Sequence, residues 1–146
     1  MFETLPDMAA KRAEISPNRI AFVEGEGGRS WSFAEVNRAA NGMAQGLLGQ
    51  GLQAGARVAI LCPNMAAFFV ALFACQKAGL ILCPLNWRQP QAELAETLAP
   101  FAPSLILHDD SFAPAAAGLA GELEIPAFGR GAAAADWMTQ GQPGSA

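Results

Sequence analysis

The sequence predicts an α/β fold, with a layered, mainly parallel sheet, flanking helices and a small β-hairpin near the N-terminus. Two apolar runs, RVAILC at residues 57–62 and LILC at residues 80–83, have the composition of strands buried on both faces of a sheet. The stretch between them carries apolar residues at helical spacing, so the three segments read as a strand–helix–strand unit. Such a unit places its two strands parallel, with a right-handed crossover.

The composition is that of one domain without a nucleic-acid partner. The 146 residues suit a single domain, and a hydrophobic fraction of 52% supplies enough apolar material for a core. The formal net charge is −4, and the nine Lys and Arg residues are scattered along the chain. Because nucleic-acid phosphates are bound by clustered positive charge, we expect no nucleic-acid partner.

Neither a signal peptide nor a transmembrane segment is predicted. Residues 1–14 contain early acidic side chains and no apolar h-region. The most hydrophobic stretch, residues 65–85, is interrupted by Gln76, Lys77 and Gly79, which leaves an apolar run too short to cross a bilayer. The three cysteines have no C-x-x-C spacing and are typical of buried, reduced thiols, so we expect a cytoplasmic protein.

The first 31 residues predict a short helix and a hairpin. Residues 7–14 are expected to form the opening helix. Residues 19–24 have the composition of a β-strand, and glycines at positions 25, 27 and 28 supply a turn. Residues 28–31 then return as a second strand, which completes a small β-hairpin.

A strong helix signal begins at Ser32. Ser32 and Glu35 have the spacing of a capping box, in which each side chain accepts a hydrogen bond from the backbone amide of the other residue. Apolar residues then recur at spacings of three and four, and Gly51 is placed to end the helix in a left-handed conformation. The apolar face comprises Phe33, Val36, Ala40, Met43 and Leu47.

Two further helices flank the strand at residues 80–83. Asn64 is expected to cap the first helix, and Gly79 to end it. The second helix has Pro90 in its first turn, continues through Leu98 and is ended by Pro100. The first helix carries large apolar residues that share one face, namely Met65, Phe68, Phe69, Leu72 and Phe73.

The C-terminal third is expected to complete the sheet. SLIL at residues 104–107 predicts a third core strand, LEI at residues 123–125 predicts a fourth, and residues 132–138 predict a short helix. We interpret residues 1–128 as one lobe. The Ala- and Gly-rich residues 129–146 are interpreted as a linker or as the start of a further segment.

The sequence contains no familiar catalytic or metal-binding pattern. The phosphate-loop pattern G-x-x-x-x-G-K-[ST] and the dinucleotide pattern G-x-G-x-x-G are both missing. Gly129 and Gly131 lie between a predicted strand and helix, where they form either an anion-binding turn or a plain helix-entry turn. No carboxylate lies between Glu35 and Glu93, so the central segment offers no acid/base pair.

His108 and the cysteines do not make a convincing site either. One histidine and three scattered cysteines supply too few ligands for zinc. A Cys83–His108 pair at neighbouring strand ends is conceivable, but a thiol inside an apolar strand is usually inert. We therefore predict no catalytic residue and no metal ligand.

Four motifs in a fixed order carry a family resemblance. They are WSFAEV at residues 31–36, the strand entry with Gly51, Gly55 and RVAI at residues 57–60, the helix end KAG at residues 77–79, and PLNWR at residues 84–88. Together they resemble the opening of the adenylate-forming enzymes, in particular the acyl-CoA synthetases, over roughly residues 5–112. Ala56 stands where that family usually has an Asp in a turn. Luciferases and peptide-synthetase adenylation domains share the pattern, but the PLNWR form favours acyl-CoA synthetases.

The resemblance implies the N-terminal lobe of the adenylate-forming fold and a reaction in two steps. A carboxylate attacks ATP to give an acyl-adenylate and pyrophosphate, and the thiol of coenzyme A then displaces AMP. ATP and coenzyme A are the implied co-substrates, with Mg expected, and none is expected to bind tightly to this chain. The implied partners are the ATP-binding lobe of the parent enzyme and a carboxylic acid.

The same resemblance implies an N-terminal fragment that is inactive alone. The family's phosphate loop, adenine-binding motifs and C-terminal catalytic lysine belong downstream of the matched region. An isolated lobe would expose apolar surface meant for its partner, so self-association is expected. The alternative is a stand-alone, non-catalytic α/β binding or interaction module derived from the same lobe. An unrelated small nucleotide-binding domain is disfavoured by the missing glycine patterns.

The candidate binding residues are Asn86, Trp87 and Arg88. In some family members the arginine of P-L-N-x-R approaches the phosphates of the coenzyme A nucleotide, and Arg88 occupies that position. A guanidinium matches phosphate oxygens, and Trp87 offers an apolar ring beside it. Alternatively, Arg88 pairs with Glu93 or with a carbonyl, and Trp87 fills a groove between lobes. For Asn86, local hydrogen bonds that fix the turn are the favoured role.

Overall fold

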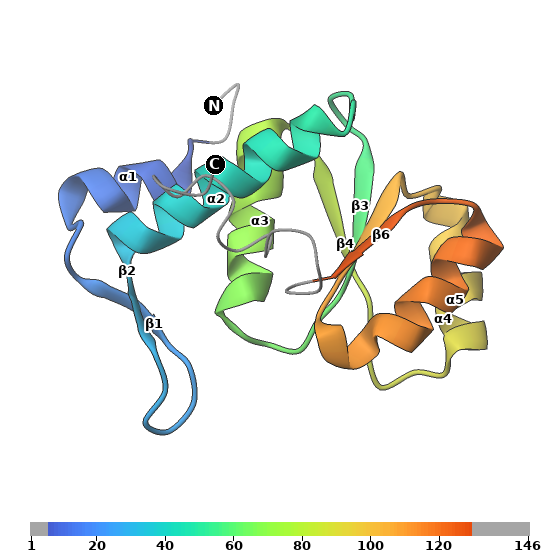
Figure 1. The fold of residues 1–146 in the computed structure, drawn as a ribbon. Helices are drawn as coiled ribbons and strands as arrows, with labels where there is room; N and C mark the ends of the chain where they lie inside the picture. Colours follow the sequence, from blue (N-terminus) through green and yellow to red (C-terminus); the bar gives the residue numbers. More distant parts are fainter. Residues whose placement is uncertain (1–5, 130–146) are drawn as a thin grey trace.

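The main sheet has four parallel strands, which confirms the predicted α/β class. The computed structural model describes residues 6–129. β3 (Arg57–Leu61) is central and pairs with β4 (Ile81–Pro84) on one side and β5 (Leu105–His108) on the other, and β6 (Ala127–Gly129) lies beyond β5 (Figure 1). The predicted strand–helix–strand unit is therefore present as β3, α3 (Ala66–Ala78) and β4, with its two strands parallel.

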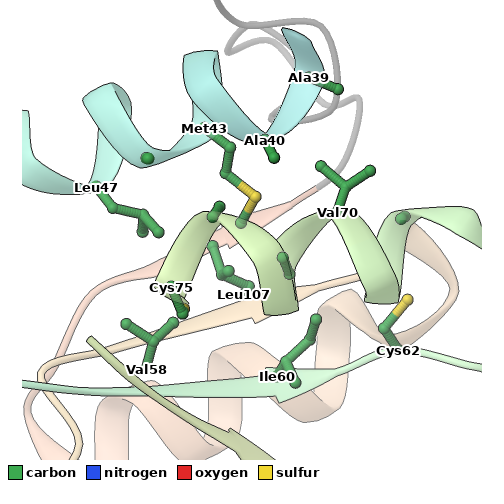
Figure 2. Close-up of a cluster of buried hydrophobic side chains, with 14 of the residues drawn as sticks. Ala39, Ala40, Met43, Leu47, Val58, Ile60, Cys62, Val70, Cys75 and Leu107 are labelled. Atoms are coloured by element: carbon green, nitrogen blue, oxygen red, sulfur yellow. The ribbon is translucent and has the colours of Figure 1, made fainter. Parts of the chain in front are cut away.

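Helices cover both faces of this sheet. α2 (Phe33–Gly49) and α3 pack on one face, and α4 (Gln91–Leu98) and α5 (Ala113–Leu123) pack on the other (Figure 1). Figure 2 shows Met43 of α2 directed toward α3, with Val58 and Ile60 of β3 on the opposite side of that helix. Each face thus has its own hydrophobic core, and the sheet separates the two.

The N-terminal hairpin lies outside the main sheet, as predicted. β1 (Ile20–Val23) and β2 (Ser30–Ser32) are antiparallel and project away from the helical layers (Figure 1). Glu24, directly after β1, ties the hairpin to the rest of the fold. One of its carboxylate oxygens accepts the Trp31 indole N–H at 3.2 Å, and the other accepts the Ala66 amide N–H at 3.2 Å.

The capping box at the start of α2 is confirmed. The Ser32 hydroxyl oxygen accepts the Glu35 amide N–H at 3.2 Å, and the Glu35 carboxylate accepts the Ser32 amide N–H at 2.8 Å. The hydrogen bond from the Ser32 backbone is the main reason that the pKa of Glu35 is lowered. Gly51, just past the end of α2, has a φ of +80°, the left-handed conformation that the sequence predicts.

A buried lysine fastens the opening helix α1 (Met8–Ile15) to α2 and α3. Lys77, near the end of α3, donates to a carboxylate oxygen of Asp7 at 2.6 Å and to the side-chain oxygen of Asn37 at 2.8 Å. Asp7 also caps α1 by accepting the Ala10 amide N–H at 3.0 Å. Burial opposes the ionisation of Asp7, but the hydrogen bonds from Lys77 and from backbone amides prevail and lower its pKa.

The start of α3 and its buried face differ from the predictions. Met65 is the N-cap residue and Asn64 makes no cap, because the Glu24 carboxylate already accepts the first free amide of the helix. The side chains buried completely are the small ones on the opposite face, since they let α2 and the sheet approach α3 closely. This buried face comprises Ala66, Ala67, Val70, Ala71, Ala74 and Cys75. Phe68, Phe69 and Phe73 remain partly exposed, and Leu72 is exposed.

The C-terminal part of the sheet also requires corrections. Residues 123–125 do not form the fourth strand. Leu123 ends α5, a helix that the sequence did not predict, and Glu124 turns the chain with a φ of +55°. The fourth strand is β6, slightly further along the chain. The predicted helix at residues 132–138 lies outside the described residues, as does the predicted linker apart from Gly129.

Pro90 and Pro100 lie at the ends of α4, close to the predicted positions. Pro90 is the N-cap residue of α4 rather than a member of its first turn. Pro100 lies within η1 (Ala99–Phe101), a 3-10 turn that extends the helix beyond Leu98. Among residues 6–129, no helix has the length and hydropathy needed to cross a membrane.

Candidate functional site

The candidate residues lie at the carboxyl end of the sheet. Asn86, Trp87 and Arg88 follow β4 directly. The helix after β3 packs on one face of the sheet and the helix after β5 packs on the other, so the chain changes direction between these two neighbouring strands. In open α/β sheets, ligands bind in the crevice at such a switch point. The sequence therefore placed its candidates at the end of the sheet where the fold favours binding.

A pocket of about 530 Å³ opens between the loop after β4 and the start of α3. Cys62 and Asn64, which follow β3, line this pocket together with Phe68 of α3. The loop contributes the three predicted residues. The complete lining is Cys62, Pro63, Asn64, Phe68, Pro84, Leu85, Asn86, Trp87 and Arg88.

Arg88 supplies the positive charge of this pocket. Its side chain is exposed, and its guanidinium carbon lies 4.8 Å from the centre of the Trp87 ring, a cation–π contact. The alternative pairing with Glu93 does not form, and the Glu93 carboxylate accepts a hydrogen bond from the side-chain Nε2 of Gln89 at 3.3 Å. Within residues 6–129 the guanidinium has no carboxylate partner, which leaves its N–H donors directed to solvent.

Asn86 shapes the loop rather than the pocket chemistry. Its side-chain oxygen accepts the Arg88 amide N–H at 3.2 Å, and its backbone carbonyl accepts the Gln89 amide N–H at 2.9 Å. The first bond is that of an Asx turn, and the second closes a β-turn over the same residues. The geometry therefore agrees with the turn-fixing role that the sequence favoured for Asn86.

The Trp87 ring contacts the Arg88 guanidinium and the Phe112 ring. Its side chain is 37% exposed, and its ring centre lies 5.8 Å from that of Phe112, at an interplanar angle of 49°. Phe112 ends η2 (Asp110–Phe112), which follows β5. Sequence reasoning missed Phe112, since nothing near position 112 signals a contact with position 87.

A second pocket, of about 520 Å³, adjoins the first. It lies between the hairpin and α3, and Asn64 lines both pockets. Its aromatic wall is formed by Phe22 and Phe69, whose rings stack at 4.9 Å, while Glu24 supplies the carboxylate. Sequence reasoning considered Asn64 only as a helix cap. Its position directly after the central strand is the signal that could have identified it as a pocket residue.

The remaining nucleophilic groups are not arranged for catalysis. His108 is buried, and its Nδ1 atom lies 2.9 Å from the Asp109 carbonyl oxygen. The expected position of Cys83 and His108 on neighbouring strands is wrong, because β3 lies between β4 and β5. Burial raises the pKa of Cys83, although Arg57 opposes this effect, and burial raises the pKa of Cys75 to about 12. No cluster of metal-binding side chains occurs in the described part of the chain.

Comparison with known proteins assigns the family. The model of the AMP-binding enzyme family matches residues 9–137. A feruloyl-CoA synthase from an Amycolatopsis species is 38% identical over 119 residues, which cover 80% of this chain and 24% of that enzyme. The chain therefore spans about a quarter of the length of this relative.

Solved structures show the same fold. The N-terminal domain of FACL13 from Mycobacterium tuberculosis superposes with a TM-score of 0.81 at 24% identity, covering 92% of this chain and 36% of that one. The o-succinylbenzoate CoA synthetase of Bacillus subtilis, solved with an acyl-adenylate intermediate, gives a TM-score of 0.75 at 26% identity, covering 85% and 31%. With its family match over most of its length, the chain belongs to the AMP-binding family of adenylate-forming enzymes, of which it represents an N-terminal portion.

Proposed function

We propose that the chain is the N-terminal portion of an ATP-dependent acid–CoA ligase. Such an enzyme joins a carboxylic acid to AMP with release of pyrophosphate, then transfers the acyl group to the thiol of coenzyme A. The relatives and structural neighbours named above include CoA ligases, which supports this reaction class. ATP with Mg and coenzyme A are then the co-substrates of the parent enzyme. The reduced thiols favour a cytoplasmic location.

Within that enzyme, Arg88 contacts a phosphate of the coenzyme A nucleotide, with Trp87 and Asn86 supporting it. The observation that carries this role is the exposed guanidinium of Arg88, which borders the pocket without a carboxylate partner. An unpaired guanidinium offers several fixed N–H donors that match phosphate oxygens. A carboxylate partner would have accepted hydrogen bonds from those donors, as side-chain oxygens of Asp7 and Asn37 accept them from the Lys77 ammonium.

These 146 residues alone do not form an acyl-adenylate. The sequence contains no Ser-, Thr- and Gly-rich phosphate loop ending in Pro-Lys-Gly, so nothing in it would hold the triphosphate for attack. ATP–pyrophosphate exchange measured on the purified chain with a panel of carboxylic acids should stay at the background rate. Robust exchange with any acid would overturn the fragment interpretation.

The role of Arg88 is tested by coenzyme A binding. Arg88→Ala should weaken binding about tenfold or more, because a charge-assisted contact to phosphate is lost. Arg38→Ala is the matched control, since Arg38 is an exposed arginine on α2 that borders neither of the two pockets. In a longer protein that contains this chain, Arg88→Ala should raise KM for coenzyme A and spare adenylate formation. Equal loss in both half-reactions would indicate a structural role instead.

The second candidate is a stand-alone, non-catalytic binding or interaction module. Exposed apolar residues favour it, because Leu72 and Ile81 lie 42% and 48% exposed near the open edge of β4. On the ligase reading, this surface faces the ATP-binding lobe, and the isolated chain self-associates through it. Light scattering can distinguish the ligase portion from the stand-alone module. The molar mass of the chain is measured alone and with the downstream segment added as a separate polypeptide. Dissociation of oligomers into a one-to-one complex supports the ligase reading.

A further inference from the structure

The contact between Trp87 and Phe112 spans the end of the central strand. Trp87 lies in the loop after β4, and Phe112 ends the turn after β5. β3 lies between those two strands in the sheet. The two loops therefore meet across the carboxyl end of β3, and the residues that follow β3 line the pocket beside Arg88.

This aromatic bridge lies on one side of the sheet only. Phe112 and Leu85 pack with the core formed by α4 and α5, whereas Phe68 belongs to the core on the α3 side. The bridge therefore lies on the side of the sheet that faces α4 and α5. The pocket beside it reaches the α3 side through Phe68, and Asn64 and Arg88 are among its lining residues.

The direction of the Arg88 side chain depends on this bridge. Within the described part of the chain, the guanidinium forms no ion pair with a carboxylate, and its cation–π partner is the Trp87 ring. Trp87 is itself held by Phe112 on one side and by the Asx turn of Asn86 in the backbone. A long arginine side chain without an ion pair has many rotamers, so a ring beneath it selects those that face the pocket.

We propose that Trp87 and Phe112 are positioning residues that hold the Arg88 guanidinium at the pocket for a phosphate-bearing nucleotide. Phe112 acts through Trp87 and touches no ligand. The proposal deepens the role of Arg88 and rests on the proposed function of that residue. It assigns Phe112, which is remote from the loop in sequence, to the same binding unit.

The first test reads the position of Arg88 without any ligand. Protons above an aromatic ring shift upfield, so the Arg88 Nε–H signal of the chain in solution should lie upfield of its usual position. Trp87→Leu should abolish this displacement, and Phe112→Leu should reduce it by about half or more, while Phe112→Tyr should retain it. The amide spectrum of each variant reports whether the fold is intact.

A matched control is present elsewhere in the chain. Arg12 lies 4.7 Å from the centre of the Phe33 ring, and Phe33 is partly buried like Phe112. Phe33→Leu should move the Arg12 signal and leave the Arg88 signal unchanged. If Phe112→Leu leaves the Arg88 signal in place in a folded chain, the positioning role of Phe112 is wrong.

The second test measures binding of adenosine 3′,5′-bisphosphate and of coenzyme A by the same signals. Phe112→Leu and Trp87→Leu should each raise Kd about two- to fivefold, the range expected for loss of a cation–π support, and Phe112→Tyr should restore the original value. Loss of affinity in Arg88→Ala without loss in Phe112→Leu overturns the positioning role alone. An unchanged affinity in Arg88→Ala overturns the proposed function of Arg88, while the ligand-free signals still decide whether Phe112 positions it.

Discussion

Two cations, Lys77 before β4 and Arg88 after it in the sequence, have opposite environments. The side chain of Lys77 is 8% exposed and donates to oxygens of Asp7 and Asn37. Arg88 is exposed, lies against an aromatic ring and has no carboxylate partner among residues 6–129. Lys77 is therefore a structural cation, whereas the guanidinium of Arg88 faces solvent. The ammonium N–H groups of Lys77 form hydrogen bonds that join three helices, whereas the guanidinium N–H groups of Arg88 can bind a ligand.

Lys77→Met should give the largest loss of stability. Methionine keeps the apolar stem but leaves the oxygens of Asp7 and Asn37 without their donor, and hydrogen bonds to charged groups are worth about 1.5–3 kcal/mol. We expect the free energy of unfolding to fall by about 2 kcal/mol in urea titrations. A change below about 0.5 kcal/mol, typical of surface sites, would remove the contrast with Arg88.

Asp7→Asn should have a smaller, pH-dependent effect. The folded chain lowers the pKa of Asp7, so its ionised form stabilises the fold at pH values above the ordinary aspartate pKa of about 3.9. That stabilisation is lost as the pH falls through the lowered pKa. Asparagine still caps α1 but carries no charge for Lys77. The wild-type Tm should therefore fall more steeply than the variant Tm below about pH 4, and parallel curves would contradict the role of Asp7.

Arg88→Met should change stability least. The side chain is exposed and joins no ion pair in the described residues, so the free energy of unfolding should stay within about 0.5 kcal/mol. This variant should be measured beside Lys77→Met under the same conditions, by urea titration. A loss as large as that of Lys77→Met would show that Arg88 is structural and that its donors are not free.

The elements that the sequence predicted correctly are those set by local chemistry. The Ser32–Glu35 capping box depends on residues three apart, and the end of α3 at Gly79 depends on one residue with a φ of +68°. The apolar runs of β3 and β4 are also local. Two errors arose where residues distant in sequence determine the structure. Glu24, rather than Asn64, accepts the first amide of α3. Close packing of α3 buries its alanine face rather than its phenylalanine face.

In the candidate site, too, local sequence was informative and long-range contacts were not. The position of Arg88 just after a strand could be predicted from the apolar run at residues 80–83. The predicted burial of that strand on both faces was wrong, because β4 lies at the edge of the described sheet and Ile81 is 48% exposed. The contact of Phe112 with Trp87 could not be predicted, because it depends on the strand order β4-β3-β5, whereas Asn64 directly follows the central strand and could have been identified. Helix α5 was missed because its Ala- and Gly-rich sequence has no clear apolar periodicity.

The carboxylate of Glu24 makes the start of α3 depend on a distant hairpin. Its two oxygens hold the Trp31 indole and the Ala66 amide, the latter 42 residues away in sequence. Separation of the hairpin from the body would break the Glu24–Ala66 bond and leave the Ala66 amide open to water, whereas the Glu24–Trp31 bond lies within the hairpin and would persist. The exchange of that single amide proton with solvent deuterium therefore records how often the hairpin detaches, even though Ala66 belongs to another element.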